Sequence, residues 1–337
     1  MKIIEPKFWW SDNPSMLIKL ISLPFGIFLK TLIFLRNKLS KKIFLPKPVI
    51  CVGNFVVGGQ GKTPFVRHLR SVLEDKDRKT VVISKGYGGK MKSSKIINET
   101  DTTIDYGDEA LLHVKDGLTV VSKNRVDAIK VLDKSHFDFV ILDDGLQDPS
   151  IHKDLNIVII DTSKGIGNNL LIPFGPMRES LNFALTKTDI IVLINSINQN
   201  HQSINNVLNF WKGIVINADY ETYIDEGIDE EIIAFSGISN PKKFTYGLKN
   251  MGARVNKHFI FSDHENISED DAKEIIEYSK LKNLKIVTTE KDLIKLKDSK
   301  KDSYREKLYL SSILAKVRIK FDEKILINFL KQKKLIQ

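Results

Sequence analysis

A glycine-rich turn ending in Lys-Thr follows an apolar run early in the chain. The run covers residues 49–52, and the turn reads Val57-Gly58-Gly59-Gln60-Gly61-Lys62-Thr63-Pro64. Glycines let backbone N–H groups close on phosphate oxygens, the lysine adds a positive charge, and the threonine offers a hydroxyl to Mg²⁺. Proline fits the first turn of a following helix, whose N-terminus favours anions. The sequence therefore predicts a nucleoside triphosphate site on a strand–loop–helix unit.

This loop is a variant of the common phosphate-binding pattern. Val56 stands where the strict pattern has its first glycine, and the nearest upstream glycine is Gly53. The loop is thus closer to the G-G-x-G-K-T form. The alternative interpretation is an ordinary glycine-rich turn that happens to precede Lys-Thr.

Composition is that of a folded protein with a basic surface. The 337 residues are 42% hydrophobic and 28% charged, and the net charge is +10. A basic balance favours nucleic acid, an anionic membrane surface or a phosphorylated substrate without choosing among them. The single cysteine, Cys51, lies in the first predicted strand, where we interpret it as a core residue; no disulfide can form within the chain.

Residues 16–35 form an apolar stretch near the N-terminus. Helical spacing places Lys19, Ser22, Gly26 and Lys30 on one face and Leu, Ile and Phe on the other. This pattern predicts an amphipathic helix lying in a membrane interface, with Trp9 and Trp10 upstream as anchors and several lysines downstream facing anionic lipid. Two alternatives stay open: packing on the chain itself or on a partner, and a true transmembrane span.

Short β-branched runs alternate with helical segments after residue 48. The expected strands are 49–52, 80–84, 119–122, 139–142, 157–160, 190–194 and 214–217. Alternation of this kind predicts a P-loop NTPase-like, doubly wound, mostly parallel α/β sheet. A polar stretch at 219–231 precedes further expected strands at 232–236, 259–261, 286–289 and 308–310. We therefore expect a membrane helix region over 1–45, a P-loop core domain over 46–220 and a smaller α/β domain over 221–337.

Carboxylates follow two of these segments. Asp143 and Asp144 end the strand at 139–142, where a phosphate-binding site needs an acidic group for Mg²⁺. The alternative is a pair of turn residues before Gly145. Asp108 opens an apolar helix, so it is a candidate proton acceptor or simply an N-terminal cap.

Other polar groups follow turns and strands farther along. Arg178 and Glu179 come after a proline-rich turn, where they form a phosphate clamp or an exposed ion pair. His264 follows Asp263 and is a candidate proton shuttle, although a lone histidine more often has no catalytic role. A further strand ends in polar residues suited to contact a base or ribose, namely Thr289, Lys291 and Asp292.

The set of motifs resembles the tetraacyldisaccharide 4′-kinases, the lipid A 4′-kinases, which share the missing first glycine. The resemblance covers about residues 50–296 and the N-terminal helix. Beyond the loop, the matching motifs are Lys85-Gly86-Tyr87-Gly88-Gly89, Gly107-Asp108-Glu109, Asp143-Asp144-Gly145-Leu146-Gln147, Pro173-x-Gly175-Pro176-x-Arg178-Glu179, Asp263-His264 and Thr288-Thr289-Glu290-Lys291-Asp292. Three positions depart from the usual family pattern, namely Ala110, Asp148 and Glu265, and any role for residue 148 is thereby in doubt.

The resemblance implies ATP-dependent phosphorylation of the 4′-hydroxyl of a tetraacylated glucosamine disaccharide 1-phosphate. It implies that Lys62 and the loop amides hold the phosphates and that Thr63 ligates Mg²⁺ with Asp143 or Asp144. Asp108, paired with His264 across the two domains, would take the hydroxyl proton. Arg178 and Glu179 would complete the phosphate and metal surroundings.

The expected partners are the lipid A precursor disaccharide and the anionic surface of the inner membrane, on whose cytoplasmic face the protein would lie as a peripheral or monotopic monomer. A membrane-associated regulatory or targeting P-loop ATPase is the main alternative, since it would need no acceptor-sugar site. A nucleic-acid-binding NTPase rests only on the net charge, and we expect no nucleic-acid partner because no aromatic-basic motif is present.

Overall fold

The computed structural model describes residues 5–11, 13–132, 136–195, 202–263 and 265–337. The chain forms two compact units. Unit 1 comprises Met1–Ile83, Arg125–Asp219 and Lys320–Gln337, and unit 2 comprises Ser84–Asn124 and Tyr220–Ile319. Each unit therefore consists of segments that are distant in sequence.

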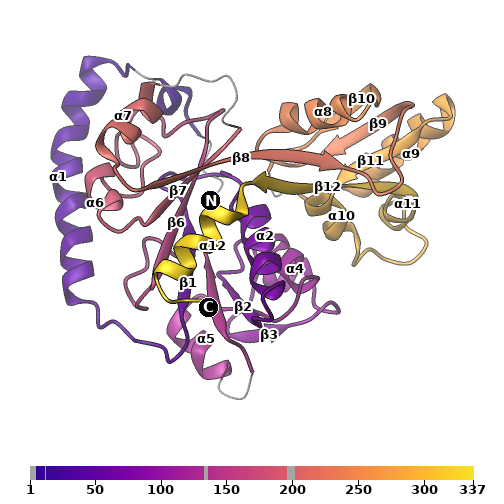
Figure 1. Cartoon of the computed structure of the whole chain (residues 1–337). Helices are drawn as coiled ribbons and strands as arrows, with labels where there is room; N and C mark the ends of the chain where they lie inside the picture. Colours follow the sequence, from indigo (N-terminus) through magenta and orange to yellow (C-terminus); the bar gives the residue numbers. More distant parts are fainter. Residues whose placement is uncertain (1–4, 12, 133–135, 196–201, 264) are drawn as a thin grey trace. The chain divides into compact units, whose positions relative to one another are not determined.

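A parallel sheet is the centre of unit 1 (Figure 1). Its strands, in spatial order, are β8 (Ile214–Tyr223), β7 (Ile190–Ile194), β6 (Leu155–Asp161), β1 (Val49–Gly53), β5 (Phe139–Asp143) and β2 (Thr80–Ser84). All the pairings from β8 to β2 are parallel. Because β1 lies between β5 and β6, the chain changes sides of β1 between these two strands, and a ligand site is expected where β1 ends.

The strands of this sheet are buried along their length. Every residue of β1, β2, β5 and β7 is buried, as the near-continuous apolar runs predict for parallel strands covered on both faces. Packing is tight at the end of β1, where a Cβ built on Gly53 would lie 2.6 Å from Leu146 Cβ. The helical elements of unit 1 are η1 (Lys7–Trp10), α1 (Met16–Leu39), α2 (Lys62–Glu74), α5 (Arg125–Val131), α6 (Leu181–Leu185), α7 (Gln202–Phe210) and α12 (Glu323–Gln332).

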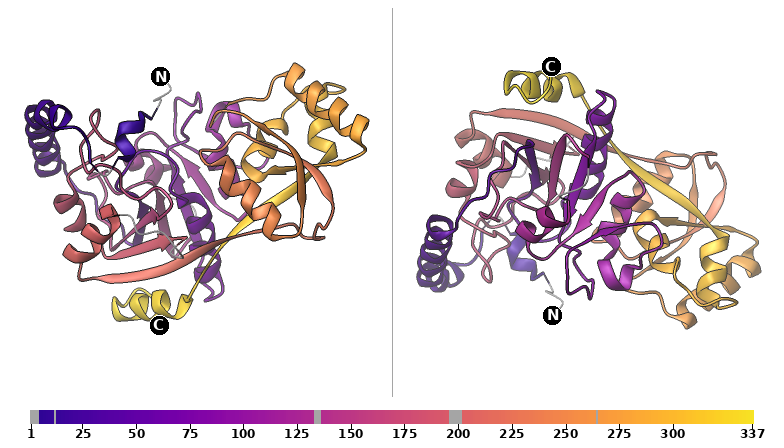
Figure 2. Two further views of the ribbon diagram at one scale, coloured as in Figure 1. Left: turned by 90° about the horizontal axis from the view of Figure 1, so that it is seen from above. Right: turned by 90° about the horizontal axis from the view of Figure 1, so that it is seen from below.

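Helix α1 lies at the border of unit 1 in every view (Figures 1 and 2). Its Phe25 ring packs edge-on against Phe174, with 5.4 Å between the ring centroids. The more buried residues recur every three or four positions and are Ile18, Ser22, Gly26, Leu29, Ile33 and Asn37. Ser22 and Gly26 of the predicted stripe thus face the protein, whereas Lys19 and Lys30 are exposed. The exposed side consists largely of Leu, Ile and Phe side chains, and the helix is long and apolar enough to cross a membrane.

Unit 2 contains a smaller set of parallel strands. Its strands are β10 (Arg254–Ile260), β9 (Glu231–Ser236), β11 (Lys285–Thr289) and β12 (Ser312–Phe321), in this order. An antiparallel pair, β3 (Lys95–Ile97) and β4 (Thr119–Val121), belongs to the same unit. Its helices are α3 (Thr103–Tyr106), α4 (Asp108–Val114), α8 (Pro241–Asn250), α9 (Glu269–Lys282), α10 (Glu290–Leu296) and α11 (Tyr304–Ser311).

The predicted fold class is confirmed: an α/β protein with a mostly parallel sheet, a smaller α/β unit and an N-terminal helix. One predicted strand is wrong, because residues 308–310 lie in α11, whose first turn is capped by Ser303. A short apolar run fits either structure, and the strand begins only at Ser312.

The bounds of the compact units differ from those of the predicted domains. Residues 84–124 group with unit 2 because Leu111 and Leu112 of α4 pack with Ile294 of α10 in one core. The last residues, Lys320–Gln337, return to unit 1. The functional division into 1–45, 46–220 and 221–337 stays a prediction.

Candidate active site

The glycine-rich loop connects β1 to α2, as the sequence predicts. β1 ends at Gly53 and α2 begins at Lys62. Gly58 and Gly61 have φ values of 94° and 86°, which a residue with a Cβ rarely adopts. Lys62 and Thr63 therefore fall in the first turn of α2, where unpaired backbone N–H groups favour an anion.

Two cations meet on one carboxylate just beyond the end of β5. Arg178 Nη1 donates a hydrogen bond of 2.6 Å to Asp144 Oδ1, and Lys62 Nζ lies 3.5 Å from the same oxygen. Burial alone would raise the pKa of Asp144, but the charges of Lys62 and Arg178 lower it well below its usual range. Asp144 is therefore ionised at neutral pH and holds both cations beside the loop.

Arg178 owes its position to a short antiparallel pairing with the loop. The N–H of Val57 donates to the carbonyl of Pro176 at 2.9 Å, and the N–H of Arg178 donates to the carbonyl of Phe55 at 3.0 Å. The residues between them form an isolated antiparallel bridge. The backbone of the glycine-rich loop thus fixes the backbone position from which the Arg178 side chain extends.

Glu179 is only 1% exposed and is held by polar groups. Lys187 Nζ lies 2.6 Å from one carboxylate oxygen, and Gln147 Nε2 lies 3.5 Å from the other. The same amide of Gln147 donates to the carbonyl of Asn54 at 3.0 Å, and its oxygen accepts from Arg178 at 3.3 Å. Gln147 therefore connects the loop, Arg178 and Glu179. It belongs to one of the sequence motifs, but no role was predicted for it.

A buried arginine that we did not single out holds the predicted metal-binding segment. Arg125 Nη2 donates to the backbone carbonyls of Asp143 and Asp144 at 2.6 and 3.0 Å. Its Nη1 lies 3.1 Å from Asp148 Oδ2. Burial tends to raise the pKa of Asp148, but hydrogen bonds from Ser150 and the charge of Arg125 lower it to about 2. Asp148, which departs from the usual family pattern, is therefore an ion-pair partner of Arg125.

The donor set beside the loop suits Mg²⁺. Among the described residues, no group of three or more His, Cys, Asp or Glu side chains could hold a metal ion. Mg²⁺ at phosphate sites needs only one or two carboxylates, because phosphate oxygens and water complete its shell. Thr63 begins α2 and Asp143 is 4% exposed at the end of β5, so a hydroxyl and a carboxylate both border the phosphate loop.

A second charged cluster lies in unit 2 around Asp108, the first residue of α4. Asp108 is 5% exposed, and its Oδ2 lies 3.9 Å from the Nζ atoms of both Lys291 and Lys295. Lys291 Nζ also lies 3.8 Å from Glu109 Oε1 and 2.9 Å from Asp263 Oδ1. Burial would lower the pKa of Lys291, but the surrounding carboxylates of Asp108, Glu109 and Asp263 raise it above its usual range.

The remaining predicted residues of unit 2 organise the start of α10. The Thr289 hydroxyl accepts from the N–H of Asp292 at 3.2 Å and lies 2.6 Å from its carboxylate. Asp292 is fully buried and pairs with Lys295 at 3.1 Å. Contact of Thr289, Lys291 and Asp292 with a nucleotide stays a prediction. His264 lies outside the described residues.

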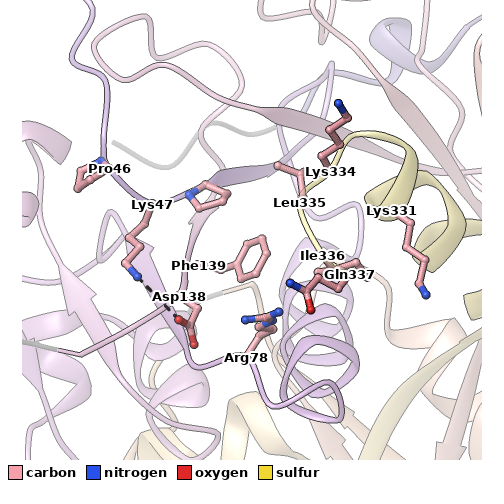
Figure 3. A pocket seen from close by; sticks show the side chains of 11 residues that line it. Pro46, Lys47, Arg78, Asp138, Phe139, Lys331, Lys334, Leu335, Ile336 and Gln337 are labelled. Carbon is pink, nitrogen blue, oxygen red and sulfur yellow. Dashed lines mark ion pairs between the residues drawn. The ribbon is translucent and has the colours of Figure 1, made fainter.

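A pocket of about 570 Å³ lies where strands β1 and β5 begin, at the end opposite to the phosphate loop (Figure 3). Lys47 and Pro48 precede β1 in its wall, and Asp138 and Phe139 stand at the start of β5. The phosphate loop follows the other end of β1. None of the predicted site residues lines this pocket.

The fold and the loop define a class of protein. A parallel sheet whose central strand ends in a glycine-rich loop, with lysine at the first position of the next helix, is the arrangement of P-loop phosphotransfer proteins. The acidic residues after the neighbouring strand β5 belong to the same arrangement.

The sequence model of the LpxK family, described as tetraacyldisaccharide-1-P 4′-kinase, matches residues 16–334. The chain belongs to this family, and the resemblance inferred from its motifs is confirmed. It is therefore an enzyme, a kinase of the P-loop class.

Similar proteins cover most of the chain. The tetraacyldisaccharide 4′-kinases of Rickettsia akari and Rickettsia canadensis are each 37% identical over 88% of this chain and 90% of their own length. The crystal structure of LpxK from Aquifex aeolicus in complex with ATP, described as an "apo" form, has a TM-score of 0.73 at 28% identity. That match covers 94% of this chain and 99% of the other.

Proposed function

We propose that this protein transfers the γ-phosphoryl group of ATP to the 4′-hydroxyl of a tetraacylated glucosamine disaccharide 1-phosphate, a lipid A precursor. The observation that carries the proposal is the meeting of Lys62 and Arg178 on Asp144 beside the phosphate loop. Two cations held at one point suit the charge that spreads over a transferring phosphoryl group.

The loop supplies the phosphate cradle. The backbone amides between Val57 and Lys62 bind the β- and γ-phosphates, and Pro64 has no N–H that would need a partner in the first turn of α2. The side chain of Gln60 is turned away from this role, because its Oε1 accepts the N–H of Asp161 at 2.7 Å. Residue 60 therefore acts through its backbone.

Lys62 and Arg178 exchange partners when the nucleotide binds. Both side chains now neutralise Asp144, which costs them part of their hydration. Phosphate oxygens offer the same cations more negative charge, so the pair is positioned in advance for the transferring group. Glu179, held by Lys187, keeps Gln147 and hence Arg178 in place.

Thr63 and Asp143 or Asp144 are the groups that would hold Mg²⁺. When bound, the ion neutralises charge on the β- and γ-phosphate oxygens. Asp144 is ionised at neutral pH, so its oxygens are available as ligands without loss of a proton.

Asp108, with His264, takes the proton from the acceptor hydroxyl. Asp108 is buried and flanked by two lysines, so its carboxylate is kept in the form that accepts a proton.

The acceptor is a lipid, and α1 supplies a surface for it. The exposed side of α1 is apolar, and the basic net charge of the chain favours an anionic bilayer. In this proposal the protein works on the cytoplasmic face of the inner membrane, as a monomer and without a nucleic-acid partner.

The test is incubation with γ-labelled ATP, Mg²⁺ and the lipid disaccharide 1-phosphate, beside a control with ATP alone. Label should enter the lipid with the wild type and with Lys280→Met, an exposed lysine on α9, but not with Lys62→Met. ATP hydrolysis without labelling of the lipid would point instead to a regulatory ATPase.

A further inference from the structure

The two lysines of α10 form a charged ridge against Asp108. Lys291 and Lys295 are four residues apart, so they lie on the same face of the helix. Each Nζ is 3.9 Å from Asp108 Oδ2, and α10 and α4 share a core through Ile294 and Leu111. The ion pairs are therefore set by the packing of two helices within one compact unit.

Lys291 also contacts Asp263, the residue that precedes His264 in the sequence. Its Nζ hydrogen-bonds Asp263 Oδ1 at 2.9 Å, in the segment that follows β10. One ammonium group thus links Asp108, the first residue of α4, to Asp263. Lys295 is tied differently, because it is almost buried and pairs with Asp292 at 3.1 Å.

Charged groups of both signs lie around Asp108. The cations among them include Lys291 and Lys295. The anions include Glu109 on the same helix, Asp263 in the loop after β10 and Asp292 on α10. Loss of the Lys291 charge would remove one cation from beside Asp108 and leave these carboxylates in place, which favours its protonated form.

We propose that Lys291 is a positioning residue for the phosphoryl transfer: it keeps the carboxylate of Asp108 ionised and holds Asp108 and Asp263 at a fixed separation. This inference rests on the proposed function, in which Asp108 accepts the proton of the acceptor hydroxyl. It is an alternative to the nucleotide contact that the sequence predicted for Lys291, and it is favoured by the three carboxylates that engage the ammonium group. A lysine in this position stays charged, as the raised pKa of Lys291 also indicates.

The test is the pH dependence of kcat/KM for the lipid acceptor between pH 5 and 9 in three variants. In every protein kcat/KM should fall at low pH, where the base is protonated; we call this fall the acid limb. In Lys291→Met the acid limb should move to higher pH by about one unit or more, because loss of the cation raises the pKa of the base. At pH values below the displaced limb, kcat/KM of Lys291→Met should be about tenfold lower than that of the wild type. At alkaline pH the two values should be equal. Lys291→Arg should keep the limb in place, and so should the exposed control Lys280→Met.

If Asp108 and His264 act together as the proposed base, the limb reports both, but loss of a positive charge moves it in the same direction whichever group titrates. An equal loss of kcat/KM at every pH in Lys291→Met, with no displaced limb, would show a merely structural role and overturn the proposal. A raised KM for ATP with an unchanged limb would overturn it in favour of the nucleotide contact.

A second measurement does not depend on turnover. The carboxyl carbon resonance of Asp108, assigned by its disappearance in Asp108→Asn, should titrate at higher pH in folded Lys291→Met than in the wild type. An unchanged titration would refute the inference. Failure of the wild type to label the lipid would count against the proposed function alone, because the resonance still reports on the ion pair.

Discussion

Arg178 donates a hydrogen bond of 2.6 Å to Asp144, although the two residues are 34 positions apart in the sequence. Backbone pairing with the phosphate loop brings the arginine there, and the end of β5 brings the aspartate. The contact therefore exists only when the loop, β5 and the proline-rich turn are all in place. It places a guanidinium beside Lys62 before any nucleotide binds.

Replacing Arg178 with Gln should lower kcat about 10²- to 10³-fold, the usual effect of losing one preorganised donor to a transition-state charge. ATP affinity should change much less, because Lys62 and the loop amides remain. Turnover of the lipid acceptor and equilibrium binding of ATP separate the two effects. Arg178→Lys keeps the charge but loses the planar donor set, so it should recover only part of the rate. Turnover near the wild-type value in Arg178→Gln would remove the guanidinium from the reaction.

Because the pKa of Asp144 is lowered, we expect its ion pairs to make the free energy of unfolding depend on pH in acid. Its folded pKa lies below the unfolded value of about 3.9, so its ion pairs contribute fully above that pH and are lost as the pH falls below it. The wild type should therefore lose more free energy of unfolding between pH 6 and pH 3 than Asp144→Asn does. Urea unfolding at several pH values measures both slopes. Parallel curves for the two proteins would show that Lys62 and Arg178 do not stabilise the ionised carboxylate.

Arg125 should be among the least replaceable residues of unit 1. It is 1% exposed and satisfies two backbone carbonyls and the Asp148 carboxylate. Arg125→Met would leave these acceptors buried without a donor, so we expect a loss of about 3–5 kcal/mol in the free energy of unfolding. The matched control is Lys130→Met on the same helix, whose exposed pair with Asp127 should contribute about 0–1 kcal/mol. A loss below about 1 kcal/mol in Arg125→Met would contradict this account.

The local parts of the site could be predicted from the sequence, because they depend on neighbours along the chain. Glycines before Lys62 and Thr63, a preceding apolar run and a following amphipathic segment specify the strand, loop and helix without reference to distant residues. Asp143 and Asp144 follow from the same reasoning, since a buried parallel strand must end near its neighbours' ends.

The distant partners could not be predicted in this way. Nothing near Arg125 in the sequence shows that its guanidinium binds the carbonyls of Asp143 and Asp144, and the only available signal was a charged residue shortly after the expected strand at 119–122. Residues 84–124 join unit 2 through side-chain packing with α10, a contact between segments nearly 200 positions apart. Apolar periodicity shows that a helix has a buried face, but it does not show which helix covers that face.

Trp9 ties the segment before α1 to the turn that carries Arg178. Its ring is 2% exposed, and its Nε1 donates to the carbonyl of Pro173 at 2.9 Å. Its own carbonyl accepts the N–H of Asn168 at 2.8 Å, and the side chain of Asn168 donates to the carbonyl of Phe8 at 3.1 Å. The N-terminal segment therefore supports the phosphate loop and also leads into α1.

Trp9→Ala should cost about 3–5 kcal/mol in the free energy of unfolding and lower kcat, because the turn that positions Arg178 loses its packing. Trp9→Phe keeps most of the packing and loses one hydrogen bond, so it should cost about 1 kcal/mol. Trp10→Ala is the matched control, since Trp10 is more exposed and its indole bonds Glu5 rather than the turn. Urea unfolding gives the stabilities, and vesicle flotation measures the membrane binding proposed for α1. If Trp9→Ala weakened flotation but left kcat unchanged, Trp9 would serve α1 alone, whereas reduced kcat with normal flotation would show that the turn depends on it.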